Sequence, residues 1–82
     1  KLSYVILFDV LECRTLRQTT QELTETYPHP FRLLDGDGNH YYYGRSKTSD
    51  DTAAFAPLDW AKNDSGCTTI EYVDSWGEWI PL

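Results

Sequence analysis

The sequence predicts a small α+β domain that spans residues 1–82, with one amphipathic helix packed on a mainly antiparallel sheet of four or five strands. A chain of 82 residues and 9.5 kDa has room for a single core only. Hydrophobic residues make up 40% of it and charged residues 24%, which favours folding over intrinsic disorder. Strand-like and helix-like segments alternate in the order β-α-β-β-β-β, which is typical of this class.

The first two elements are a strand and a helix. Residues 4–11 are almost continuously apolar and rich in β-branched and aromatic side chains, as in a strand that lies centrally or is covered on both faces. Over residues 15–27 the large apolar side chains Leu16, Leu23 and Tyr27 share one helical face. Threonine is frequent in this segment and lowers its helix propensity, so we expect the helix to depend on packing against the sheet.

A hairpin is the clearest local signal. Residues 31–35 and 40–45 are strand-like, and the Gly-Asp-Gly-Asn sequence between them consists of residues typical of tight turns. Strict strand alternation would place Tyr42 on the face opposite Tyr41 and Tyr43.

The remaining segments complete the sheet. Residues 46–52 are polar and read as an exposed loop, and a short helix near residues 56–62 is compatible with Pro57 in its first turn. Residues 68–74 form a strand, and residues 78–82 form a last short strand whose Pro81 suits an edge or a terminus.

Charge limits the classes of partner. The chain carries 13 Asp and Glu against 7 Lys and Arg, a net charge of −6, and the excess of acids is concentrated in residues 46–82. Nucleic acids and anionic membranes bind through Lys and Arg, so we expect neither as a direct partner. The alternative interpretation is that the acidic residues have no binding role and only keep the protein soluble and monomeric.

Metal and cofactor sites are not expected. Residues 35–39 resemble the opening of a calcium-binding loop, but His40 stands where such a loop needs glycine, and Ser46 where it needs glutamate. Cys13 and Cys67 lack the close spacing of a zinc site. We expect both to be reduced, mostly buried residues, with a single disulfide as the alternative.

Catalysis is not expected either, because the chain has no nucleophile elbow, phosphate-binding glycine loop or metal motif. Pairing of Cys67 with either histidine, as nucleophile and base, stays a formal alternative. The chain has no run of apolar residues long enough to span a membrane and no signal-peptide pattern, although removal of a signal peptide stays open. We therefore expect a cytoplasmic protein.

The function favoured by the residues is protein binding without catalysis. Tryptophan and tyrosine dominate binding hot spots, and charged rims steer partners of opposite sign. One version is an inhibitor that occupies the basic nucleic-acid-binding surface of another protein, as anti-CRISPR and anti-restriction proteins do. The alternative is a small ligand-binding domain or enzyme that stacks a sugar or a base on an aromatic face. The candidate residues for binding a protein partner are Tyr42, Asp50, Asp51, Asp59, Trp60, Asp64, Glu71, Asp74, Trp76 and Glu78.

Overall fold

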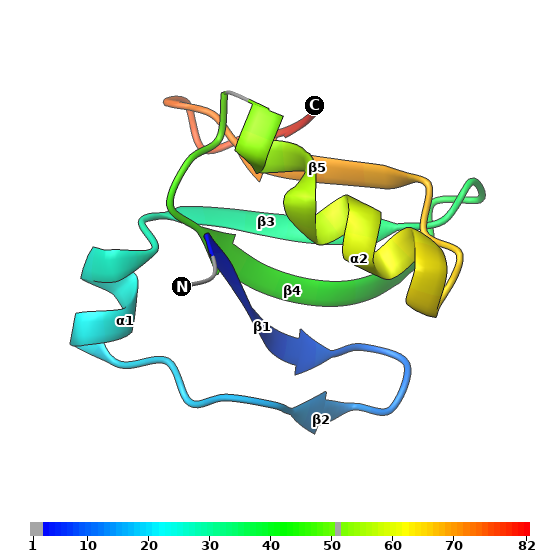
Figure 1. The fold of residues 1–82 in the computed structure, drawn as a ribbon, viewed down its shortest axis with the longest axis horizontal. Coiled ribbons are helices and arrows are strands. Elements are labelled where there is room, and N and C mark those ends of the chain that lie inside the picture. The colour runs from blue at the N-terminus through cyan, green and yellow to red at the C-terminus, as the bar shows by residue number, and fades with distance from the viewer. Residues whose placement is uncertain (1–2, 51) are drawn as a thin grey trace.

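A computed structural model of the chain describes residues 3–50 and 52–82, and it confirms an α+β fold with an antiparallel sheet. Six strands form one sheet in the order β2-β1-β4-β3-β5-β6, and a continuous helical segment crosses one face of it (Figure 1). The elements are β1 (Tyr4–Asp9), β2 (Arg14–Thr15), α1 (Gln21–Thr26), β3 (His29–Leu34), β4 (His40–Ser46), the 3-10 helix η1 (Thr52–Phe55), α2 (Ala56–Asp64), β5 (Thr69–Val73) and β6 (Trp79–Pro81).

The helix that packs on the sheet is not the predicted one. The segment expected to be a helix over residues 15–27 contains only the six-residue α1, which buries none of its side chains. Its first part is extended and includes β2, and Thr20 caps the helix by accepting from the Leu23 amide. A threonine-rich segment gains little from a long helix, and threonine is a good capping residue, so the helix begins late and stays short.

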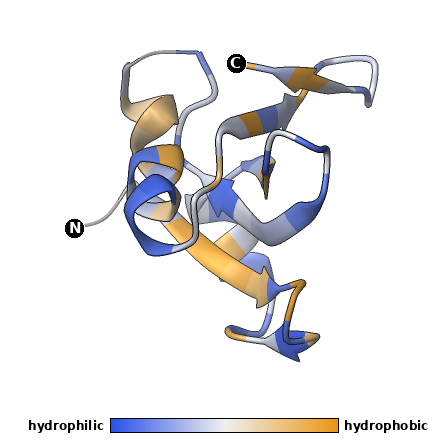
Figure 2. Cartoon of the chain, turned by 90° about the vertical axis from the view of Figure 1, so that its right-hand side faces the viewer, coloured by the Kyte–Doolittle hydropathy of each residue, from blue (hydrophilic) through white to orange (hydrophobic). Residues whose placement is uncertain are grey.

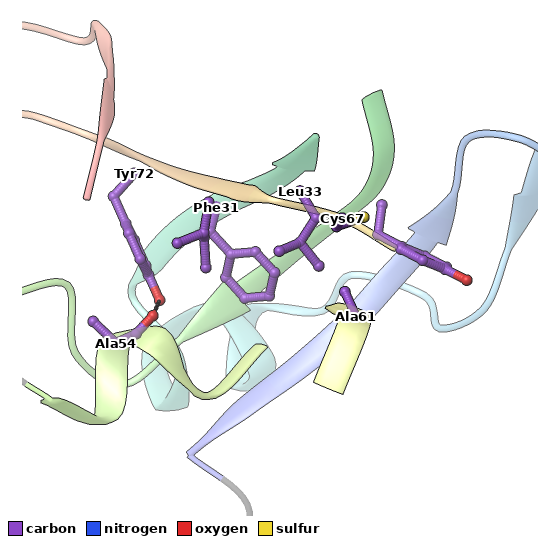
Figure 3. Packing of buried hydrophobic residues seen from close by; sticks show 8 residues of the cluster. Phe31, Leu33, Ala54, Ala61, Cys67 and Tyr72 are labelled. Carbon is purple, nitrogen blue, oxygen red and sulfur yellow. Dashed lines mark hydrogen bonds between the residues drawn. The ribbon is translucent and has the colours of Figure 1, made fainter. Parts of the chain in front are cut away.

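The sheet is covered instead by η1 and α2, in the region where only a short helix was expected. Ala54, Pro57 and Ala61 of this segment are buried. They pack on side chains of the sheet, among which Phe31, Leu33, Ile70 and Tyr72 are almost fully enclosed (Figure 3). Small residues let the helix approach the sheet closely, which explains why this segment, despite its modest apolar content, forms the second layer.

The sheet also has more strands than the four or five predicted. The additional strand, β2, has only two residues, Arg14 and Thr15, opposite Asp9 and Phe8 of β1. Such a short strand has no sequence periodicity to detect. The predicted first strand was expected to be central or covered on both faces, but β1 is second from the edge, and Val5 is its one buried residue.

Two β-bulges decide which face each side chain reaches. The register between β3 and β4 shifts at Tyr41, and the register between β1 and β4 shifts at Leu7. Because of the first bulge, Tyr41 packs against the same core cluster as Tyr42, so the predicted opposition of these two rings is wrong. Tyr43 alone faces away from the core, and its ring stacks on that of Phe8.

Gly44 lies opposite Ile6 of β1 and Phe31 of β3 in the middle of the sheet. A Cβ atom at this position would collide with the carbonyl oxygen of Val5 and with the ring of Phe31. The glycine therefore provides the space into which the Phe31 ring packs.

Candidate functional site

The turn between β5 and β6 presents an exposed tryptophan on an ordered backbone. Asp74 Oδ1 accepts hydrogen bonds from the amides of Trp76 and Glu78, each at 2.9 Å. The Asp74 amide donates to the carbonyl of Glu78, and Gly77 takes a positive φ of 81° to close the turn. Trp76 lies at the tip of this turn and is 87% exposed. The turn thus holds an indole ring in solvent, between two acidic residues.

Trp60 and Tyr42 are placed differently, on the helical side of the sheet. Trp60 of α2 is half-buried, and its ring packs edge-on against that of Tyr42 at 5.0 Å between centroids. Tyr42 is buried, and its hydroxyl donates to Asp64 at 3.2 Å. Burial, together with this bond, raises the pKa of Tyr42. These three residues therefore join α2 to the sheet, and of the three only Asp64 is exposed.

The other acidic candidates lie apart from one another. Asp59 is exposed on α2, and Asp50 is exposed in the loop after β4, where its carboxylate accepts from the Thr48 hydroxyl. Asp51 lies outside the described residues. Glu71 lies on the opposite face of the sheet from α2, paired with Arg32. Among the candidates within the described residues, the structure therefore brings together on one turn only Asp74, which is half-buried, and the exposed Trp76 and Glu78.

The face of the sheet away from α2 carries a groove that the sequence analysis missed. Its volume is about 320 Å³. Arg32 Nε donates to Glu71 Oε1 at 2.6 Å, and the Arg32 guanidinium lies 4.5 Å from the centre of the Trp79 ring. Alternation along residues 29–34 could have indicated that Arg32 faces away from Phe31 and Leu33. The side chains that line the groove include Leu7, Pro30, Arg32, Tyr43, Arg45 and Trp79.

In the turn that resembles a calcium-binding loop, the Asp35 carboxylate is occupied by hydrogen bonds from nearby residues. The Asp35 carboxylate accepts from the Asn39 side chain, from the amides of Asn39 and Asp37, and from the Tyr41 hydroxyl. These bonds, chiefly those from Asn39, hold the pKa of Asp35 below its usual range. The described residues contain no cluster of three or more His, Cys, Asp or Glu side chains that could hold a metal ion.

The cysteines are free. Cys67 is buried as expected, with its sulfur 3.4 Å from Ser65 Oγ, whereas Cys13 is exposed, with a positive φ of 53°. Burial raises the pKa of the Cys67 thiol, so at neutral pH it is protonated and a poor nucleophile. His40 bonds through Nδ1 to the Tyr43 hydroxyl at 2.9 Å, on the opposite face of the sheet from the core that encloses Cys67.

Comparison of the chain with protein-family models, with curated proteins and with solved structures gives no match. None of the helices in the part of the chain described here has the length and apolar character needed to cross a membrane.

Proposed function

We propose that the protein is a non-catalytic binding module that engages a protein partner through the β5–β6 turn, with Trp76 as the anchor. The observation that carries the proposal is the 87% exposure of this side chain on a turn fixed by Asp74. An indole ring contributes a large contact area, and a fixed backbone loses little conformational entropy on binding. Both properties are typical of an interface hot spot.

The charge around the anchor favours a basic partner. Asp74 and Glu78 flank Trp76, and the adjoining strand β5 contains no Lys or Arg. Complementary charges accelerate association. We propose in particular a cytoplasmic partner whose basic surface binds nucleic acid, with this protein as an inhibitor that occupies that surface. This mode of action is analogous to that of small anti-defence proteins, such as anti-CRISPR and anti-restriction proteins.

The test compares three immobilised proteins for capture of partners from a cell lysate, followed by binding kinetics with the purified partner. Trp76→Ala removes the anchor, and Ser75→Ala is the matched control in the same turn. We expect the wild type and Ser75→Ala to recover the same basic protein, and Trp76→Ala to lose it with an unchanged melting temperature. Recovery of the same protein by folded Trp76→Ala would exclude the turn as the binding site.

Charge is tested separately with the purified partner. Glu78→Lys should slow association at low salt and have little effect at high salt, whereas Asp59→Lys on α2 should change association less. Equal effects of the two reversals would indicate a response to net charge alone, without a contact at the turn.

A second candidate function is favoured by the groove on the open face of the sheet. Trp79 and Tyr43 offer aromatic rings there, and Arg32 offers a guanidinium, the combination that stacks a sugar or a base. A thermal-shift screen of monosaccharides and nucleosides tests it. We expect a stabilising compound to lose its effect with Trp79→Ala and to keep it with Trp76→Ala.

A further inference from the structure

Among residues 3–50 and 52–82, no strand pairs with the outer edge of β1 at Tyr4–Ile6. The Lys47 amide donates to the carbonyl of Ser3 at 2.8 Å, which sets the hydrogen-bonded register between β1 and β4. Since these groups alternate along an antiparallel strand, the amide and carbonyl of Val5 also point toward β4. Those of Tyr4 and Ile6 point away from it, toward the edge of the sheet.

The strand on the other side does not reach this edge. β2 pairs with β1 only at Phe8 and Asp9. The amides of Leu16 and Arg17 both donate to the carbonyl of Leu7, at 2.8 and 3.2 Å, and these are the last bonds from this segment to β1 among the described residues. The chain then leaves the edge to form α1, which lies well apart from β1 in Figure 1.

The chain returns to the sheet beyond α1, where Arg45 fixes it. Arg45 Nε donates to the carbonyl of Tyr27 at 2.7 Å, and Nη2 donates to that of Pro28 at 3.2 Å. The segment from Arg17 to Tyr27 is thus attached at both ends and stands away from β1 between them.

A slot lies between this segment and β1. It has a volume of about 350 Å³ and is lined by Tyr4, Val5, Ile6, Arg17, Tyr27 and Trp60. Arg17 and Tyr27 also line a neighbouring hollow of about 340 Å³ against α1. Apart from Arg17 the lining is apolar or aromatic, and β1 itself is the strongly hydrophobic strand in the lower part of Figure 2.

We propose that this slot accepts an extended segment of a partner protein, which adds to the free edge of β1 as a further strand. Outward amide and carbonyl groups at a strand edge specify an extended backbone as the complement. Trp60, Tyr4 and Ile6 provide an apolar wall for alternate side chains of that segment.

The charge of the slot specifies the segment further. Arg17 is the one charged residue in the lining, and Lys47 lies near it, with Nζ 5.8 Å from the centre of the Tyr27 ring. The segment therefore alternates apolar side chains with polar ones and carries an Asp or Glu that faces Arg17. This surface is separate from the β5–β6 turn, so the inference does not depend on the proposed function.

The test uses a phage-displayed library of random twelve-residue peptides, selected on the wild-type protein. Synthetic copies of the enriched peptides are then titrated against Arg17→Glu and, as the matched control, Arg14→Glu, an exposed arginine of β2 outside the slot lining. We expect enriched peptides with alternating apolar residues and an acid, which bind Arg17→Glu about tenfold more weakly. Their affinities for Arg14→Glu and Trp76→Ala should stay within about twofold of the wild type.

Amide hydrogen exchange locates the peptide without any substitution. In the free protein the Ile6 amide should exchange rapidly and the Val5 amide slowly. Binding of the peptide should slow exchange of the Ile6 amide and leave that of the Val5 amide unchanged. The proposal is overturned if the selection enriches no such peptide, if Arg17→Glu binds as well as the wild type, or if Ile6 stays unprotected in the complex.

Discussion

The hydroxyl of Tyr72, on β5, donates a 2.8 Å hydrogen bond to the carbonyl oxygen of Ala54 in η1, in the buried layer between helix and sheet (Figure 3). In a 3-10 turn that carbonyl would accept from the residue three positions later, but this residue is Pro57, which has no amide hydrogen. Tyr72 supplies a donor from the sheet, so a side chain from one layer satisfies the backbone of the other.

Replacement of Tyr72 by phenylalanine should lower the free energy of unfolding by about 1–3 kcal/mol, because it removes a donor from a buried carbonyl. Urea denaturation measures the change. Tyr43→Phe is the control, since that ring is 37% exposed and water can replace the lost bond. If both substitutions lowered the free energy of unfolding equally, the buried hydrogen bond from Tyr72 would make no specific contribution to stability.

Gly44→Ala should destabilise the fold by about 1–3 kcal/mol or more, because the added methyl group meets the Val5 carbonyl and the Phe31 ring. Gly36→Ala is the matched control, since its nearest new contact is Thr68 Oγ1 at 3.9 Å. Thermal unfolding of the two variants should separate them clearly. An unchanged melting temperature for Gly44→Ala would mean that β1, β3 and β4 are not packed as described.

The two thiols should differ in reactivity toward a disulfide reagent such as dithionitrobenzoate. In the native protein one thiol should react within seconds and the other only after denaturant is added, because Cys67 is 1% exposed and burial raises its pKa. Cys13→Ser should abolish the fast phase and leave the slow one. A fast phase that survives in native Cys13→Ser would contradict the burial of Cys67.

The Asp35 carboxylate should make stability depend on pH in acid. Its pKa is lowered in the folded state, so its contribution is complete above the usual aspartate value of about 3.9 and is lost as the pH falls through the folded-state pKa. Asp35→Asn should therefore be less stable than the wild type at pH 7, and the difference should vanish in strong acid. Urea titrations at several pH values test this, with Asp37→Asn as a control that leaves the Asp35 carboxylate in place.

Two tryptophan truncations should differ in their effect on stability. Trp60→Ala removes a half-buried ring that packs on Tyr42, so we expect a loss of about 2–3 kcal/mol, less than for a fully buried tryptophan. Trp76→Ala should change the melting temperature by only a degree or two, because the ring is almost entirely in solvent. Unfolding of Trp76→Ala would mean that the ring packs within the protein and is not available to a partner.

Local signals in the sequence identify most of the sheet. The β3–β4 hairpin is predicted from its turn residues, and β5 and a short helix near residues 56–62 fall where they were expected. The features that sequence alone did not reveal depend on contacts between distant segments. The bulge at Tyr41 arises where β3 and β4 pair, and α2 covers the sheet because Ala54 and Ala61 allow close approach.

The candidate site was predicted less completely than the fold. Composition singled out acids and tryptophans together, whereas their environments differ: Trp76 is exposed, Trp60 packs on Tyr42, and Glu71 pairs with Arg32. No local pattern carries this information, because the partner of each side chain is contributed by another strand or helix. The same holds for the groove beside Trp79 and for the free edge of β1.

The strand order has a consequence for how the chain folds. Only β3 with β4, β1 with β2, and β5 with β6 are neighbours through short turns, whereas β1 with β4 and β3 with β5 pair segments far apart in sequence, such as Tyr4 with Ser46 and Phe31 with Tyr72. Closing such long loops is entropically costly and slows folding. We expect the β3–β4 hairpin to form first as a nucleus, and the two outer hairpins to dock on its opposite sides in the rate-limiting step.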